Sequence, residues 1–328
     1  MLRLPRLRYL RPGSAREAAA LCAELGARAV LVAGGTDLYP KLKRRQMEPD
    51  TLVGLTHLPE LREVARTRDG GFELGALVTL AAASRNPELV TALPGYAEAA
   101  GLVSSPPLRN VGTIGGNLCV DTRCNYYDMT YEWRKSVGFC MKKDGEICLV
   151  APSSPRCWAV SSTDTAPVAI ALGATVILAG PDGERELPVS ALYRDDGIEY
   201  LAKRPFEVVT ALRLPPADGV RTAYVKLRRR GSIDFPIAGA GVALKLGDGD
   251  VVEWARVVLS GVGSHPVEAV EADHFLAGRK LDREVIAQAA DLAARPAKPL
   301  DNADLSHFWR KRMVRVIVEQ ALEKALRL

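Results

Sequence analysis

The sequence lacks several features that would assign it to whole classes of protein. No window approaches eighteen uninterrupted apolar residues, which excludes a transmembrane helix. Residues 1–12 are basic but contain no apolar run or small-residue cleavage site, so no secretory signal peptide is expected. The formal net charge is only +5, with acidic and basic residues interspersed, and this argues against a nucleic-acid partner. We therefore expect a cytoplasmic protein with no membrane association.

The chain also lacks any C-x-x-C pair, so the short-spaced signature of a zinc ribbon is absent. Five of its six cysteines nevertheless lie between residues 119 and 157, in a segment too polar to be core. Cytoplasmic thiols stay reduced, which favours metal ligands over disulfides. Buried, unliganded thiols are the simpler alternative, but this density of cysteines argues against it. The candidate ligands are Cys124, Cys140, Cys148 and Cys157.

The spacing of these four cysteines does not distinguish tetrahedral zinc from a [4Fe–4S] cluster. Cys119 directly follows a glycine-rich turn, and Cys22 lies in a segment rich in helix formers. Both are expected to be structural.

Two glycine-rich segments precede the cysteines. The apolar run 29–33 reads as a buried strand and continues into Gly34-Gly35-Thr36-Asp37-Leu38, and a second segment runs from Asn110 to Asn117. Backbone N–H groups in such segments can approach a phosphate or a ring edge closely. A tight turn followed by a helix cap is the alternative for the first segment.

A chain of 328 residues with 48% hydrophobic and 25% charged residues is an ordinary globular protein of two or three domains. The Pro- and Gly-containing run 215–219 is the best candidate linker. Beyond it, three short strands and two helices predict a small sheet backed by helices. The last helix carries one apolar face, formed by Val314, Ile317, Val318, Ala321, Leu322 and Ala325.

Four segments together resemble the FAD-binding subunit of the molybdenum hydroxylases, the family of xanthine dehydrogenase and carbon monoxide dehydrogenase. They are 31–38, 111–117, Thr163-Asp164 and Tyr224-Val225-Lys226. The resemblance covers nearly the whole chain. Most members run directly from the Gly-Gly-Asn turn to the Asp-containing segment, whereas this chain carries an insertion at about 119–160. The insertion resembles that of the β subunit of 4-hydroxybenzoyl-CoA reductase, whose extra loop holds a [4Fe–4S] cluster.

The resemblance implies an α+β fold. A two-part FAD-binding domain of the vanillyl-alcohol-oxidase or PCMH type would occupy residues 1–216 and contain the cluster-bearing insertion. Residues 217–328 would form a small C-terminal domain like that of the carbon monoxide dehydrogenase flavoprotein.

The resemblance also implies roles for individual residues. The first glycine segment would hold the FAD diphosphate and ribose, the second would lie against the flavin, and Val209 would flank the ring. Asp164 matches an acidic residue of the flavin site, and Lys226 matches a lysine near the ring system. The implied FAD-binding residues are Leu31, Val32, Ala33, Gly34, Gly35, Thr36, Asp37, Leu38, Thr113, Ile114, Gly115, Gly116, Asn117, Asp164, Val209 and Lys226. The implied [4Fe–4S] ligands are Cys124, Cys140, Cys148 and Cys157.

In such an enzyme the chain would relay electrons rather than bind substrate. A ferredoxin-like donor would reduce the cluster, and electrons would pass through FAD to a small subunit with two [2Fe–2S] centres and a large molybdopterin subunit, in a dimer of heterotrimers. The substrate would be 4-hydroxybenzoyl-CoA. The alternatives are a related molybdenum hydroxylase with another aromatic or acyl-CoA substrate, a zinc-stabilised FAD-binding module, and a free-standing flavin oxidase.

Overall fold

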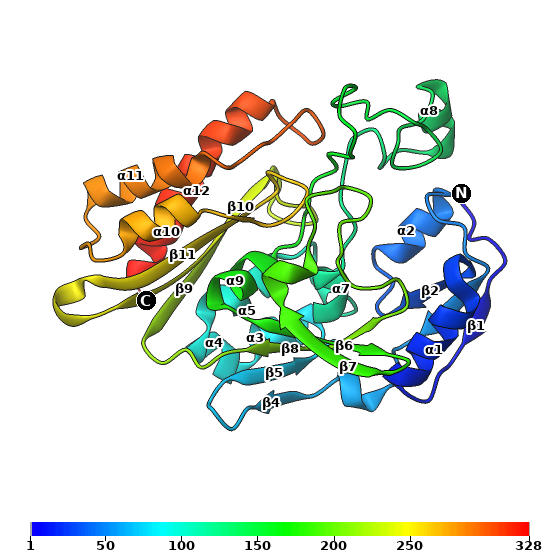
Figure 1. Cartoon of the computed structure of the whole chain (residues 1–328), viewed down its shortest axis with the longest axis horizontal. Helices are drawn as coiled ribbons and strands as arrows, with labels where there is room; N and C mark the ends of the chain where they lie inside the picture. The colour runs from blue at the N-terminus through cyan, green and yellow to red at the C-terminus, as the bar shows by residue number, and fades with distance from the viewer. Residues whose placement is uncertain (1, 328) are drawn as a thin grey trace.

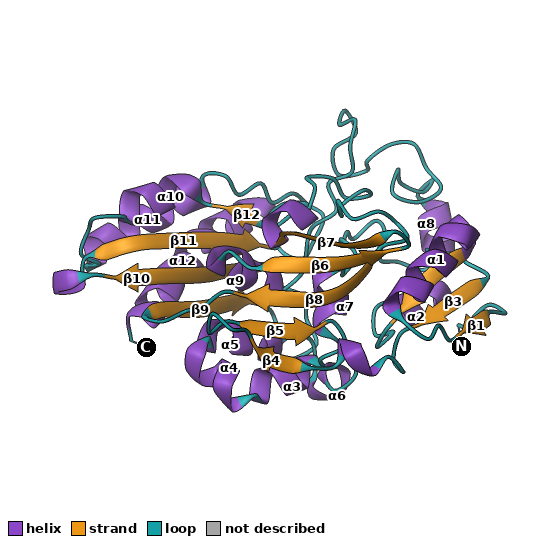
Figure 2. Ribbon diagram, turned by 60° about the horizontal axis from the view of Figure 1, so that its bottom comes forward, coloured by secondary structure: helices purple, strands orange, loops and turns teal. Residues whose placement is uncertain are grey.

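The computed structural model describes residues 2–327 and contains three sheets with helices packed around them (Figures 1 and 2). The N-terminal elements are β1 (Arg8–Leu10), α1 (Ala15–Leu25), β2 (Ala29–Val32), α2 (Leu38–Lys43) and β3 (Thr51–Gly54). The three strands form a parallel sheet in the order β1-β3-β2. Parallel neighbours need a crossover connection, and α1 and α2 supply these crossovers. Helix α1 begins after Ser14, whose Oγ accepts a hydrogen bond from the backbone N of Glu17 at 3.1 Å.

The second sheet is antiparallel and has the strand order β4-β5-β8-β6-β7. Its strands are β4 (Val64–Arg66), β5 (Phe72–Gly75), β6 (Thr175–Gly180), β7 (Gly183–Pro188) and β8 (Val208–Leu214). The helices between β5 and β6 in this unit are α3 (Leu80–Arg85), α4 (Pro87–Ala92), α5 (Pro94–Leu102), α6 (Pro106–Arg109), α7 (Ile114–Leu118) and α9 (Thr165–Leu172). Apolar side chains of the sheet and of these helices, except α6, form one continuous core.

The third sheet is antiparallel, in the order β12-β11-β10-β9. Its elements are β9 (Val220–Leu227), β10 (Ala238–Leu246), β11 (Val252–Ser260), β12 (Val267–Glu268), α10 (Val270–Leu276), α11 (Arg283–Ala294) and α12 (His307–Leu326). All six residues of the apolar face predicted for the last helix are buried, and α12 packs against β9 and β10. This part of the sequence prediction is confirmed.

The other face of the third sheet packs against α5 and α9. Successive residues of β10 alternate between the two faces: Val242 and Leu244 join the core beneath α12, whereas Ala243 joins the core of the second sheet. Gly241 lies where α9 crosses β10, and a Cβ at this position would come within 2.7 Å of the backbone N of Val168. Glycine therefore permits the close contact of α9 with the third sheet. The α+β prediction is confirmed.

The insertion is mostly irregular and contains one short helix, α8 (Tyr131–Ser136). In Figure 1 its loops project beside the N-terminal unit, near α2. Its two ends pair with each other: Arg123 N donates to Val160 O at 2.8 Å, and Val160 N donates to Arg123 O at 2.7 Å. It also has a small core of its own, which contains three of the predicted ligand cysteines and Tyr127.

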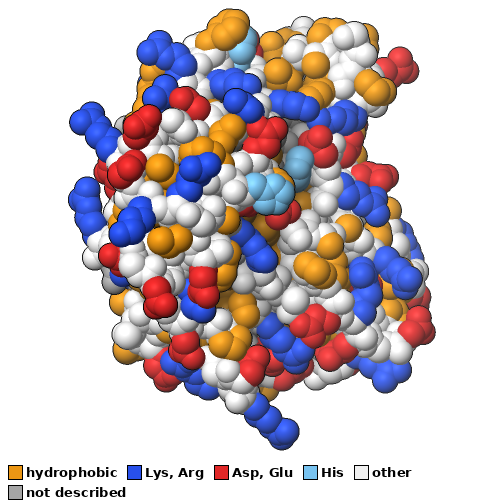
Figure 3. Space-filling model, turned by 60° about the vertical axis from the view of Figure 1, so that its left-hand side comes forward, with side chains coloured by type: hydrophobic (Ala, Val, Ile, Leu, Met, Phe, Trp, Pro, Cys, Tyr) orange, Lys and Arg blue, Asp and Glu red, His pale blue; other side chains and the backbone are white. Residues whose placement is uncertain are grey.

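No helix within residues 2–327 combines the length and apolar character needed to cross a membrane. On the face shown in Figure 3, basic and acidic side chains are interspersed, as the mild net charge predicts. Four short 3₁₀ segments complete the described chain, at Gly26–Arg28, Pro59–Leu61, Val189–Leu192 and Asp248–Asp250.

Candidate cofactor site

The two glycine-rich segments lie against each other. Gly34 lies just after β2 and packs tightly against the second segment. A Cβ at this position would come within 2.1 Å of the carbonyl oxygen of Val111. Gly35 has φ +68°, a backbone conformation that residues other than glycine adopt only with strain. The hydroxyl of Thr36 lies 3.6 Å from the Cβ position of Gly112. Residues separated by more than seventy positions in the chain thus form one narrow backbone cradle.

The second segment is a short helix rather than the turn that its glycines predict. Thr113 caps α7, because its Oγ1 accepts a hydrogen bond from Gly116 N at 3.1 Å. Gly115 N donates to Ala76 O at 2.9 Å, and a Cβ at Gly115 would lie 2.8 Å from the Ala76 Cβ. Glycine at this position lets α7 lie directly on the chain that follows β5.

Asn117 joins α7 to the segment that follows the insertion. Its Oδ1 accepts hydrogen bonds from Thr163 Oγ1 at 3.0 Å and from the backbone N of Thr165 at 3.2 Å. Ser162 is buried beside this junction, and its Oγ has no hydrogen-bond partner within residues 2–327. A buried hydroxyl without a partner fits a site that a polar ligand completes.

Asp164 and Lys226 meet in the interior, between α9 and β9. Lys226 Nζ lies 3.0 Å from Asp164 Oδ2 and also donates to Leu102 O at 3.0 Å. Tyr224 donates its hydroxyl proton to Asp164 Oδ1 at 2.7 Å. Burial raises the pKa of Asp164, and the Lys226 ammonium and Tyr224 hydroxyl oppose that rise. The predicted acidic and basic residues therefore form one buried polar network.

Tyr224 was given no role by the sequence analysis, although it lies in the segment that carried the resemblance. It stands two positions before Lys226 on β9, so the two side chains point to the same side of the strand. That spacing was a signal that could have placed both residues at the site.

The apolar residues expected around FAD are mostly part of the surrounding core. Ile114 is fully buried and Val209 nearly so, both in the core of the second sheet. Leu31 and Ala33 pack in the core under α1, and Val32 and Leu38 pack in the small core under α2. In this arrangement the apolar side chains fix the position of the cradle, and their contacts with the cofactor stay a prediction.

The six cysteines are all free thiols. Cys22 packs in the core of the N-terminal unit, and Cys119 packs against the core of the second sheet. The four predicted ligands are buried in the insertion. Burial raises the pKa of Cys124 to about 12 and that of Cys157 to about 11, and the neighbouring thiolates add to both shifts. Cys124 and Cys157 would therefore need a bound cationic group to remain ionised.

The thiols do not form a compact site for a single ion. Within residues 2–327, no three or more His, Cys, Asp or Glu side chains are arranged to hold one metal ion. In tetrahedral zinc sites the Zn–S bonds are about 2.3 Å, which places the sulfur atoms about 3.8 Å apart. A cluster of four irons and four sulfides is larger and keeps its cysteines further apart.

Charged side chains join the insertion to the N-terminal unit. Arg123 pairs with Asp37 at the end of the first glycine segment. Asp121 pairs with Lys41 of α2 and with Lys142, the latter at 2.8 Å. Burial would raise the pKa of Asp121, but Lys142 and Lys41 outweigh burial and lower it to about 2. We call these five residues the charged seam; sequence analysis assigned none of them except Asp37.

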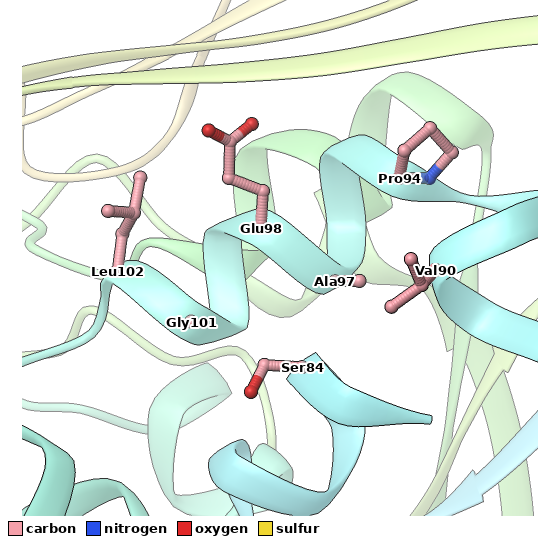
Figure 4. A pocket seen from close by; sticks show the side chains of 7 residues that line it. All are labelled: Ser84, Val90, Pro94, Ala97, Glu98, Gly101 and Leu102. Carbon is pink, nitrogen blue, oxygen red and sulfur yellow. The ribbon is translucent and has the colours of Figure 1, made fainter. Parts of the chain in front are cut away.

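A separate cavity of about 340 Å³ lies over α3, α4 and α5 (Figure 4). Its lining is mostly small or apolar, and the carboxylate of Glu98 points away from Ser84 and pairs with Lys324 of α12. It offers no free cation among its lining residues for a diphosphate.

Two family models match most of the chain. Residues 5–217 match the family described as the FAD binding domain in molybdopterin dehydrogenase. The chain belongs to this family. Residues 222–325 match the carbon monoxide dehydrogenase flavoprotein C-terminal domain, and the exact boundary at 216 and 217 stays a prediction. The chain is thus an FAD-binding medium subunit of the molybdenum hydroxylases.

Relatives align over almost their whole length. The carbon monoxide dehydrogenase medium chain of Afipia carboxidovorans is 30% identical and covers 97% of this chain and 96% of its own. The 6-hydroxypseudooxynicotine dehydrogenase complex subunit alpha of Paenarthrobacter nicotinovorans is 27% identical, with 98% and 95% covered. The crystal structure of Cu,Mo carbon monoxide dehydrogenase contains a chain that is 28% identical, with a TM-score of 0.81 and 98% of both chains covered.

Proposed function

We propose that this chain is the FAD- and [4Fe–4S]-containing electron-transfer subunit of a molybdenum-dependent 4-hydroxybenzoyl-CoA reductase. The observation that carries the proposal is the insertion, which gathers four buried free thiols and is attached by the charged seam to an FAD-binding cradle. Cys124, Cys140, Cys148 and Cys157 are the proposed cluster ligands. A binding site beside the flavin would let electrons enter FAD from a second redox centre of the same chain.

FAD would bind in the cradle formed by Gly34 to Asp37 and Thr113 to Asn117. The backbone N–H groups of Gly34 to Asp37 suit the diphosphate, whereas those of residues 114–117 already bond within the protein. Asp164, Lys226 and Val209 are the proposed neighbours of the ring. Bound FAD exchanges electrons singly or in pairs, and the protein contributes orientation and electrostatics. The buried Lys226 ammonium would favour negative charge on a nearby reduced ring, and Asp164 would hold that ammonium in place.

The proposed partners are a large molybdopterin subunit and a small subunit with two [2Fe–2S] centres, in a dimer of heterotrimers in the cytoplasm. A ferredoxin-like protein would supply electrons at the insertion. At the large subunit, two electrons and two protons would replace the phenolic hydroxyl of 4-hydroxybenzoyl-CoA by hydrogen and release it as water. The product would be benzoyl-CoA.

Two other functions remain as outcomes of the test. The relatives include carbon monoxide and nicotine-derivative dehydrogenases, so a related hydroxylase with another aromatic or acyl-CoA substrate is the first. A zinc-stabilised FAD-binding module is the second. The metal content of the purified protein distinguishes zinc from the cluster.

The test is metal analysis of the protein purified without oxygen. We expect about four irons and four acid-labile sulfides per chain, and Cys140→Ser should lose iron but keep FAD. Cys119→Ser is the matched control, because Cys119 lies near the ligands in sequence but packs on the flavin domain. Zinc in place of iron would reject the cluster. Equal iron loss in both variants would reject the ligand assignment. Turnover of 4-hydroxybenzoyl-CoA by the reconstituted complex then tests the substrate.

A further inference from the structure

Arg123 contacts three separate parts of the molecule. Its guanidinium pairs with Asp37 at the flavin cradle and with Asp128 of the insertion, the latter at 3.2 Å. Its Cζ lies 4.3 Å from the centre of the Phe235 ring, which belongs to the loop between β9 and β10. Only 13% of the side chain is exposed. One arginine therefore links the cradle, the insertion and the C-terminal region.

The contact with Asp128 continues to a predicted cluster ligand. While one oxygen of Asp128 accepts from Arg123, the other accepts a hydrogen bond from the backbone N of Cys124 at 3.1 Å. An unbroken chain of hydrogen bonds thus runs from Asp37, through Arg123 and Asp128, to Cys124. The two ends of this chain are the two proposed cofactor sites.

We propose that Arg123 is a positioning residue that couples FAD binding at the cradle to the order of the cysteine insertion. At one end it neutralises Asp37, whose free carboxylate would repel the negatively charged diphosphate of FAD. At the other end it holds Asp128, which fixes the backbone of Cys124. The half of the inference that concerns the cluster rests on the proposed function; the half that concerns FAD does not.

Coupling of two sites through one residue is reciprocal. If Arg123 orders the cradle and the insertion together, bound FAD must stabilise the insertion by the same factor by which the ordered insertion strengthens FAD binding. Measured couplings between sites usually lie between about fivefold and 150-fold. Both directions can be measured without turnover.

The first measurement is the dissociation constant of FAD, from the quenching of flavin fluorescence on FAD-free protein. Arg123→Gln should raise it at least about fivefold. The matched control is Arg156→Gln. Arg156 directly precedes Cys157 as Arg123 precedes Cys124, but its guanidinium stacks 3.6 Å from the Trp158 ring and pairs with Asp195 at 2.9 Å. The control should bind FAD like the unmodified protein.

The second measurement is the rate at which a chelator removes iron, with and without FAD. Where the insertion opens and recloses faster than the chelator removes iron, the rate of iron loss follows the opening equilibrium. FAD should then slow iron loss at least about fivefold in the unmodified protein and not in Arg123→Gln. The proposal would be overturned if the FAD dissociation constant of Arg123→Gln were within about twofold of the unmodified value. It would also be overturned if Arg156→Gln weakened FAD binding as much as Arg123→Gln does. Arg123→Lys, which retains the charge, should recover part of the FAD affinity. Iron-free unmodified protein would reject the proposed cluster, and the FAD constants would still decide the role of Arg123 at the cradle.

Discussion

The buried pair of Asp164 and Lys226 gives the sharpest test of the electrostatics at the proposed flavin site. The Lys226 side chain is fully buried and that of Asp164 is only 2% exposed. Lys226→Met preserves most of the volume and removes the cation, so within residues 2–327 Asp164 keeps only the Tyr224 hydroxyl as a hydrogen-bond partner. Removing one member of a buried ion pair costs about 3–5 kcal/mol of unfolding free energy, because the remaining charge stays desolvated.

The cost should depend on pH in a defined direction. Burial already raises the pKa of Asp164, and Lys226 is the largest opposing cause, so its loss raises that pKa further. A carboxyl whose folded pKa exceeds its unfolded pKa binds its proton more tightly in the native state. Stability therefore falls by about 1.4 kcal/mol per pH unit as pH rises from the unfolded value toward the folded one. Lys226→Met should be more destabilising at pH 8 than at pH 5.

The assay is urea unfolding of FAD-free protein at both pH values. The control is Lys324→Met, whose partner Glu98 belongs to a pair that is more than one-third exposed and should contribute at most about 1 kcal/mol. Adding Asp164→Asn to Lys226→Met should restore part of the loss, since it removes the unpaired charge. A loss below about 1 kcal/mol, or one equal at both pH values, would refute the argument.

Three further variants test other parts of the site. Gly34→Ala would force its Cβ against the Val111 carbonyl, so the purified protein should have a lower ratio of flavin to protein absorbance. Gly231→Ala is the control, because a Cβ at Gly231 meets open space, and it should leave this ratio unchanged. Asp121→Asn removes a carboxylate whose pKa falls from 3.8 to about 2 on folding. The lowered pKa contributes about 2 kcal/mol of unfolding free energy above pH 4, and this contribution is lost as pH falls toward 2. In acid titrations the unmodified protein should therefore lose this stability, whereas Asp121→Asn should not. Tyr224→Phe removes a hydrogen bond to a buried carboxylate and should lower the unfolding free energy by about 2 kcal/mol in urea titrations.

The sequence could predict features that repeat over short distances or match a known family. The apolar face of α12 follows the helical period, and all its predicted residues are buried. The glycine segments were expected to permit close approach of the backbone, and Gly34 packs too tightly on Val111 to carry a side chain. Their approach to a cofactor stays a prediction. For Asp164 the simplest local expectation was a helix N-cap. The structure places it at the start of α9 without a capping hydrogen bond, because its carboxylate turns to Lys226 instead.

What the sequence could not predict depends on contacts between distant residues. Asp37 and Arg123 are 86 positions apart, and Lys41 and Asp121 are 80 apart, so no local period relates them. The glycines after Thr113 suggested a turn, but the threonine cap and the packing on Ala76 stabilise a helix there. Local propensity was overridden by tertiary contacts at these positions.

The pairing of Arg123 with Val160 explains how the family fold can carry the insertion. Two backbone hydrogen bonds hold the ends of the insertion together, so the path from α7 to α9 is closed before the cysteine loop begins. Lengthening a loop whose ends are already adjacent costs little additional entropy, and this loop buries its own apolar side chains. The residue that closes the path is also the residue that pairs with Asp37. Closure of the loop and its connection to the proposed flavin cradle therefore depend on the same residue, the first through its backbone and the second through its side chain.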